Sequence, residues 1–172
     1  MAKPTRSTAK SDAAFPRRGH DHHRCVADAL SQAEAVCAKR GARLTEIRRQ
    51  VLALVWESHA PIGAYQILEK LAESGKRPAP IAVYRALDFL MEQGLVHRLA
   101  SRNAFLGCGH PDTNHQAQFL ICDSCGSVAE LADSRIVDAI ADRAGRSGFA
   151  VAGHMVEIQG LCPDCRRSAH AG

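Results

Sequence analysis

The stretch AVYRALDFLMEQGLVHRL, residues 82–99, joins a helix signal to a strand signal. Five of its apolar residues are spaced i, i+3, i+4, i+7 and i+8, as on the buried face of a helix: Val83, Ala86, Leu87, Leu90 and Met91. Because Pro80 lies near the first turn and Gly94 follows the last, the pattern predicts a helix from Pro80 to Gln93. Two short strand candidates at 96–99 and 104–106 predict a hairpin directly after it.

Three more helices are predicted before this stretch. Apolar residues repeat at helical spacing from Val26 until Gly41 ends the pattern, again around residues 44–55 with Thr45 as N-cap, and from residue 63 to 74. Several short helices followed by a hairpin are typical of a winged helix-turn-helix domain.

The remaining 65 residues, from Cys108 onward, predict a different unit. We expect strands at 119–122 and 127–131, a helix at 134–146, and a strand at 149–158 that leads to Cys162. On the helix, Ile136, Val137 and Ile140 are expected to point inward. So short a segment builds a small core, which metal binding or dimerisation would stabilise. The fold class is therefore α+β: an N-terminal winged helix-turn-helix followed by a small C-terminal α/β domain.

Two Cys-x-x-Cys pairs, Cys122 with Cys125 and Cys162 with Cys165, suggest one metal site with four sulfur ligands. Thirty-six residues separate the pairs, more than the roughly 12–20 of zinc ribbons and fingers. The spacing makes sense if the first pair lies in a turn between strands and the second follows the last strand. Four thiolates form a closed, tetrahedral structural zinc site, and two unrelated cysteine pairs are the alternative.

A second candidate metal site combines His97, Cys108, His115 and Glu130. These residue types suit tetrahedral zinc, and the thiolate disfavours harder ions such as magnesium. They come from the hairpin, the connection and the C-terminal unit, so one metal would fix the angle between the two units. Because the chain has nine histidines, other combinations stay open.

The positive charge of the N-terminal part and two residues of the predicted helix 80–93 indicate DNA binding. Residues 1–107 contain 17 Lys and Arg against 10 Asp and Glu, a net charge of +7, whereas residues 108–172 carry −3. Tyr84 and Arg85 lie near the start of the predicted helix 80–93, where a recognition helix meets base edges. The alternative is that residues 1–24, which alone carry +4, account for much of the charge and that both side chains are ordinary surface residues.

Other classes of protein are disfavoured. The longest apolar run has six residues, far below the roughly 20 of a membrane span, and no apolar stretch follows the basic N-terminus as in a secretory signal. Seven cysteines in such a chain are expected to be reduced, which indicates the cytoplasm. Nothing in the sequence calls for an organic cofactor.

With these motifs in order over residues 25–167, the chain resembles the ferric uptake regulator superfamily, and most closely its zinc uptake regulator branch. The motifs that carry the resemblance are residues 82–99, Cys108, His115, ICDSCGSVAE at 121–130 and GLCPDC at 160–165. The resemblance implies a homodimeric, zinc-dependent transcriptional repressor of zinc-uptake genes that binds double-stranded operator DNA.

The resemblance also implies residue roles. Structural zinc falls on Cys122, Cys125, Cys162 and Cys165, and regulatory zinc on His97, Cys108, His115 and Glu130, giving two zinc ions per chain. DNA contacts fall on Tyr84, Arg85 and Tyr65. The expected domains are a disordered tail (1–22), a winged-helix DNA-binding domain (23–100), a hinge (101–108), a zinc-stapled dimerisation domain (109–167) and a short tail (168–172).

The residues are also compatible with other functions. An iron, manganese or peroxide sensor could use the same scaffold, although Cys108 and the lack of a His- and Asp-rich run before residue 119 favour zinc. His110 is a rival or supplementary ligand, and His154 is a candidate ligand for a third site. A zinc nucleobase deaminase would need His-x-Glu and Pro-Cys-x-x-Cys, whereas this chain has His154-Met-Val-Glu157 and a proline inside the second pair, so we expect no enzyme.

Overall fold

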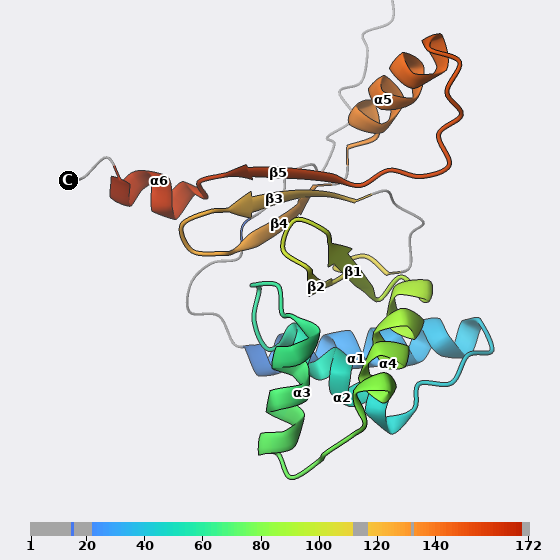
Figure 1. Ribbon diagram of the computed structural model, residues 1–172, viewed down its shortest axis with the longest axis vertical. Helices are drawn as coiled ribbons and strands as arrows, with labels where there is room; N and C mark the ends of the chain where they lie inside the picture. Colours follow the sequence, from blue (N-terminus) through green and yellow to red (C-terminus); the bar gives the residue numbers. More distant parts are fainter. Residues whose placement is uncertain (1–14, 16–21, 112–116, 132, 170–172) are drawn as a thin grey trace, which may run out of the picture.

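The computed structural model describes residues 15, 22–111, 117–131 and 133–169. A helical N-terminal module lies against a C-terminal module built on a sheet, with a β-hairpin between them (Figure 1). The N-terminal module contains α1 (His22–Lys39), α2 (Glu46–Trp56), α3 (Ala64–Glu73), α4 (Pro80–Glu92), β1 (Val96–Leu99) and β2 (Ala104–Gly107). The C-terminal module contains β3 (Gln118–Cys122), β4 (Val128–Leu131), α5 (Ser134–Arg146), β5 (Val156–Gly160) and α6 (Pro163–Ala169).

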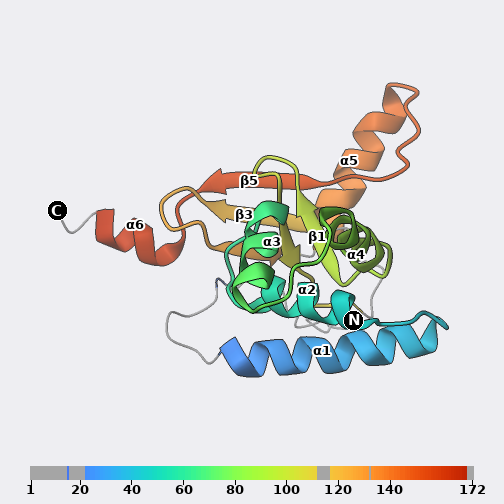
Figure 2. The ribbon, with the colours of Figure 1, turned by 60° about the horizontal axis from the view of Figure 1, so that its bottom comes forward.

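Helix α4 confirms the strongest sequence signal. Pro80 occupies its first turn, where a missing N–H costs nothing, and Gly94 ends it with a φ of 65°, a conformation that favours glycine. Its apolar face packs on α2 in the main core, and α1 covers the outside of α2 (Figure 2). Thr45 stands at the N-cap of α2 as expected, although its side chain makes no capping hydrogen bond.

The hairpin of β1 and β2, which we call the wing, is antiparallel with His97 opposite Leu106. Asn103 accepts a positive φ of 45° in its turn, as asparagine does more readily than most residues. Ile62, before α3, exchanges backbone hydrogen bonds of 2.9 and 2.8 Å with Phe105 and so ties the wing to the helices. Helices followed by a wing confirm the winged helix-turn-helix.

A tight contact anchors the last residue of the wing. The side chain of Trp56, the one tryptophan of the chain, lies against the backbone of Gly107. A Cβ at Gly107 would lie 2.3 Å from two atoms of the indole ring, so glycine is required there. The contact fixes the strand immediately before Cys108.

The C-terminal sheet has the order β4-β3-β5. Strand β3 pairs antiparallel with β4 but parallel with β5, with Cys122 opposite Gly160. Two parallel neighbouring strands need a long crossover between them in the chain, and here the segment with β4 and α5 provides it. The crossover explains the wide spacing of the two cysteine pairs.

A second cluster of buried residues joins the modules. Its members come from the wing and from the C-terminal module: Leu99, Leu106, Ala117, Phe119, Ile121 and Val128. The wing therefore packs on the C-terminal sheet with a small core of its own.

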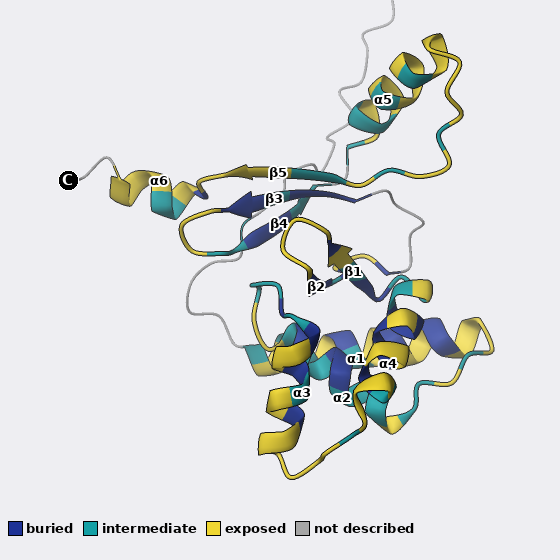
Figure 3. Ribbon diagram, in the orientation of Figure 1, coloured by how far each residue is buried: buried dark blue, intermediate teal, exposed yellow. Residues whose placement is uncertain are grey.

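Three details of the C-terminal module differ from the sequence prediction. Helix α5 begins and ends as expected, with the Asp133 side chain accepting from the Arg135 amide, but no residue of α5 is buried. The helix projects from the sheet, so the stripe with Ile136, Val137 and Ile140 is only half-buried in the single chain (Figures 1 and 3).

The other two differences follow the end of α5. The strand expected from residue 149 begins only at Val156. Phe149 belongs instead to the turn that ends α5, where Gly148 has a φ of 72° and the Phe149 amide donates to the Ala144 carbonyl. Helix α6 was not expected; it begins directly after Cys162.

The expected domain bounds stay a prediction. The expected hinge, residues 101–108, includes β2, and the expected C-terminal tail, residues 168–172, begins within α6. The expected disordered tail, residues 1–22, lies outside the described residues apart from Phe15 and His22. Among the described helices, none has the length and apolar character to cross a membrane.

Replacing Gly107 by alanine should destabilise the fold. The added methyl group would collide with Trp56, and overpacking of this kind typically costs about 1–3 kcal/mol. Thermal unfolding should show a lower Tm for Gly107→Ala. The matched control is Gly153→Ala, because an added Cβ there meets nothing within 4 Å; equal Tm values for both variants would contradict the account.

Candidate metal centres and nucleic-acid interface

The four paired cysteines gather at the ends of two parallel strands. Cys122 ends β3 and Cys125 lies in the turn after it, whereas Cys162 directly precedes α6 and Cys165 lies in the first turn of that helix. One sulfur atom from each lies within 4.8 Å of the others, and none of the four cysteines forms a disulfide.

The geometry of this thiol cluster fits a tetrahedral ion. The sulfur atoms of Cys125 and Cys162 are 3.7 Å apart, too far for a disulfide. Four sulfurs at about 2.3 Å from a zinc ion would be about 3.8 Å from one another. Burial alone would raise the pKa of the Cys122 thiol, but hydrogen bonds, first from the Cys162 amide and then from the turn after Cys122, lower it to about 6. The cluster thus favours a thiolate, the form that binds metal.

The second group lies where the wing meets the sheet. His97 on β1, Cys108 after β2 and Glu130 on β4 offer ligand atoms within 4.8 Å of one another. His97 Nε2 is 3.6 Å from Glu130 Oε1, and the Gly109 amide donates to Glu130 Oε2 at 3.3 Å. The His97 ring packs edge-on against Phe119, with ring centroids 5.2 Å apart. Nitrogen, sulfur and oxygen donors in one partly buried place suit zinc.

Cys108 is held as a neutral thiol without metal. It is 2% exposed, and its burial, then the nearby Glu130 carboxylate, raise the pKa of the thiol to about 12. Metal binding at this group must therefore displace a proton from Cys108.

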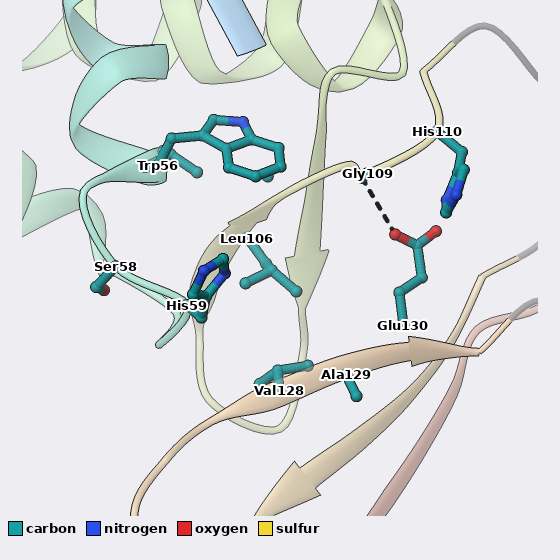
Figure 4. A pocket seen from close by; sticks show the side chains of 11 residues that line it. Trp56, Ser58, His59, Leu106, Gly109, His110, Val128, Ala129 and Glu130 are labelled. Carbon is teal, nitrogen blue, oxygen red and sulfur yellow. Dashed lines mark hydrogen bonds between the residues drawn. The ribbon is translucent and has the colours of Figure 1, made fainter. Parts of the chain in front are cut away.

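Three other histidines were considered as metal ligands from the sequence. His115 lies outside the described residues, so its expected role stays a prediction. His110 and His154 belong to neither group of candidate ligands among the described residues. His110 lies beside Glu130, where both line a cavity of about 310 Å³ with Trp56, His59 and Leu106 (Figure 4). The cavity opens next to the second group.

The expected DNA contacts lie on exposed surface of α3 and α4. Tyr65 is 76% and Tyr84 40% exposed, and Arg85 is exposed too. Ile81, in the first turn of α4, is 58% exposed. The sequence places it outside the core stripe, on the face that carries Tyr84 and Arg85, but assigns it no DNA contact. Large apolar and aromatic side chains that face solvent on such a helix are suited to contact base edges.

Two polar links between the modules were missed as well. Glu157 on β5 accepts hydrogen bonds from the wing turn, and Arg102 in that turn lies 2.9 Å from Asp123. Both contacts join residues far apart in the chain, so sequence spacing gave no signal for them.

The chain is similar to a known protein family and to individual members of it. Residues 39–159 match the model of the ferric uptake regulator family. The zinc uptake regulation protein of Escherichia coli K12 is 41% identical over 137 residues, which cover 79% of this chain and 80% of that protein.

Two zinc uptake regulators of known structure are also similar to this chain. A zinc uptake regulator complexed with zinc and DNA has a TM-score of 0.79 at 38% identity, covering 84% of this chain and 97% of that chain. Holo XcZur has a TM-score of 0.74 at 43% identity, covering 80% and 96%, whereas apo XcZur has 0.50 at 42%, covering 83% and 99%. The chain is therefore more similar overall to holo XcZur than to apo XcZur.

Metal affinity at the second group should rise with pH. Since the Cys108 thiol stays protonated below a pKa of about 12, binding releases one proton, and the apparent affinity should increase roughly tenfold per pH unit from about pH 7 to 8.5. Competition with a chromophoric chelator would measure this. Cys108→Asp, already ionised in that range, is the control and should show a flatter slope; a flat profile for the unaltered protein would contradict the prediction.

Proposed function

The chain belongs to the ferric uptake regulator family, and from this premise we propose that it is a zinc-responsive repressor that binds operator DNA and controls zinc-uptake genes. The observation that carries the proposal is the position of His97, Cys108 and Glu130 between the wing and the sheet. A ligand shared by two modules favours one arrangement of them, which is what a regulator needs.

Zinc is the metal that best fits both groups. The four-cysteine cluster would hold structural zinc, and His97, Cys108 and Glu130, with His115 as fourth ligand, would hold regulatory zinc, two ions per chain. Bound there, the regulatory ion would supply strong bonds across the boundary between modules. Moving an arrangement from 1% to 99% of molecules takes roughly 5.5 kcal/mol of preferential binding. An iron, manganese or peroxide sensor is the alternative. The buried thiol of Cys108 disfavours it, because a thiolate ligand prefers zinc to harder metal ions such as manganese.

DNA binding follows from the exposed face of α4. Arg85 can bridge two acceptors of guanine, and Tyr84 and Tyr65 can contact thymine methyls or the backbone. The relative solved with zinc and DNA supports this part of the proposal. A regulator of transcription acts where the chromosome is, so we place the protein in the cytoplasm; it is not an enzyme.

A homodimer is part of the same proposal. Helix α5 presents a half-buried apolar stripe, and Ile158 and Leu161 on and after the edge strand β5 are 44% and 50% exposed. Apolar surface of this kind is expected to be covered by a second copy. Two recognition helices related by dimer symmetry, about 34 Å apart, would read a pseudo-palindromic operator.

Two cysteine substitutions would distinguish the regulatory zinc site from the structural zinc site. Cys108→Ser should keep a folded dimer with one zinc per chain but abolish zinc-dependent operator binding, because the regulatory group loses its thiolate. Cys122→Ser should instead destabilise the fold or the dimer, since structural zinc sites contribute folding energy. Zinc content, size-exclusion mass and operator affinity should be measured on the same preparations. Normal zinc dependence in Cys108→Ser would overturn the assignment.

An arginine substitution would test the DNA face. Arg85→Ala should weaken operator binding by about 1–3 kcal/mol and relax the preference for one base, because a bidentate guanine contact is lost. The matched control is Arg146→Ala, which removes an exposed arginine from α5 in the C-terminal module. Fluorescence anisotropy with operator variants would provide the measurement; equal losses in both variants would point to general electrostatics instead.

A further inference from the structure

The wing is attached to the C-terminal sheet at its turn as well as at the metal ligands. Glu157, on β5, accepts hydrogen bonds from the backbone amides of Ala100 at 2.7 Å and Ser101 at 3.1 Å. The Ser101 hydroxyl also donates to this carboxylate. Burial alone would raise the pKa of the Glu157 carboxyl, but these hydrogen bonds lower it. The turn is thus bound by an ionised carboxylate through three donors.

An ion pair adds to this contact from the next residue of the turn. Arg102 Nη2 lies 2.9 Å from Asp123 Oδ1, in the loop after β3. Both side chains are more than a third exposed, so we expect this pair to contribute little alone. Glu157, which is half-buried, is the stronger link.

Strand register relates Glu157 to the candidate metal group. Phe119 on β3 is paired with Glu130 on one side and with Glu157 on the other. Residues paired across neighbouring strands point to the same face of a sheet. One row of the sheet therefore presents two carboxylates to the wing: Glu130 meets His97 near the start of β1, and Glu157 meets the turn after β1.

We propose that Glu157 is a positioning residue of the switch, which anchors the wing turn without metal and sets the zinc concentration at which operator binding appears. The proposal rests on the proposed function. The apolar packing of the wing has little directional preference, whereas polar attachments at both His97 and the turn fix its direction. The anchor raises the fraction of molecules already in the closed arrangement, and apparent zinc affinity rises with that fraction.

The first test is a zinc titration of operator binding. Glu157→Ala should shift the half-maximal zinc concentration roughly tenfold upward, since charge-assisted hydrogen bonds to the turn are lost. Saturating zinc should restore the affinity of the unaltered protein, because ample zinc can close the wing unaided. Glu157→Gln, which keeps one acceptor oxygen, should show a smaller shift. Asp138→Asn is the control, because it removes an exposed carboxylate elsewhere in the C-terminal module.

The second test needs neither regulatory zinc nor DNA. In a Cys108→Ser background, hydrogen exchange of the Ala100 and Ser101 amides should accelerate roughly tenfold when Glu157→Ala is added. Ser101→Ala should shift the zinc midpoint in the same direction, and combining it with Glu157→Ala should add little, because the hydroxyl acts through this carboxylate.

The outcomes separate the two proposals. A midpoint within twofold of the unaltered protein, or unchanged amide exchange, would overturn the role of Glu157 while leaving the proposed function intact. Loss of affinity that saturating zinc does not restore would also overturn it, since Glu157 would then act on the fold or on DNA. If the unaltered protein bound operator without regard to zinc, the proposed function would fail, and amide exchange would still decide whether the anchor exists.

Discussion

The packing of the wing on the C-terminal sheet is the contact on which the rest of the structure depends. Leu99 and Leu106 enter a small core with Phe119, Ile121 and Val128, and this core places the two modules face to face. His97 and Cys108 approach Glu130 only because that packing exists. Since apolar contact has little directional preference, the polar links at its edges decide how the modules are oriented. A ligand bound at this boundary therefore acts on the arrangement of the whole molecule.

The parallel pairing of β3 with β5 imposes a second constraint. It brings the ends of both strands to one edge of the sheet, where Cys122 meets the pair at 162–165. The same register aligns Glu130, Phe119 and Glu157 in one row. The three described strands of this sheet thus supply the thiol cluster at one edge and two contacts to the wing on one face. Stabilising that sheet would also stabilise the surface on which the wing packs.

Local patterns predicted most of the elements, and the exceptions have physical causes. Helix α4 and the wing agree with the sequence because helical spacing, proline and glycine act over a few residues. The inward face expected for α5 was wrong, since an apolar stripe does not reveal whether its partner lies in the same chain. The strand expected from residue 149 was too long because a helix-ending turn can contain apolar residues such as Phe149. Helix α6, of seven residues, is too short for periodicity to indicate it.

The sequence by itself determined the residue types that metal and DNA chemistry require, the two cysteine pairs, and the order of helices and strands that carries them. It suggested the group of His97, Cys108 and Glu130, with His115, but left it as one combination among nine histidines. Tertiary structure decided which groups meet: Trp56 on Gly107, and Glu157 on the turn of the wing. These contacts depend on strand register and on packing between distant segments. Neither is encoded by spacing along the chain, because many registers are compatible with one pattern of alternation.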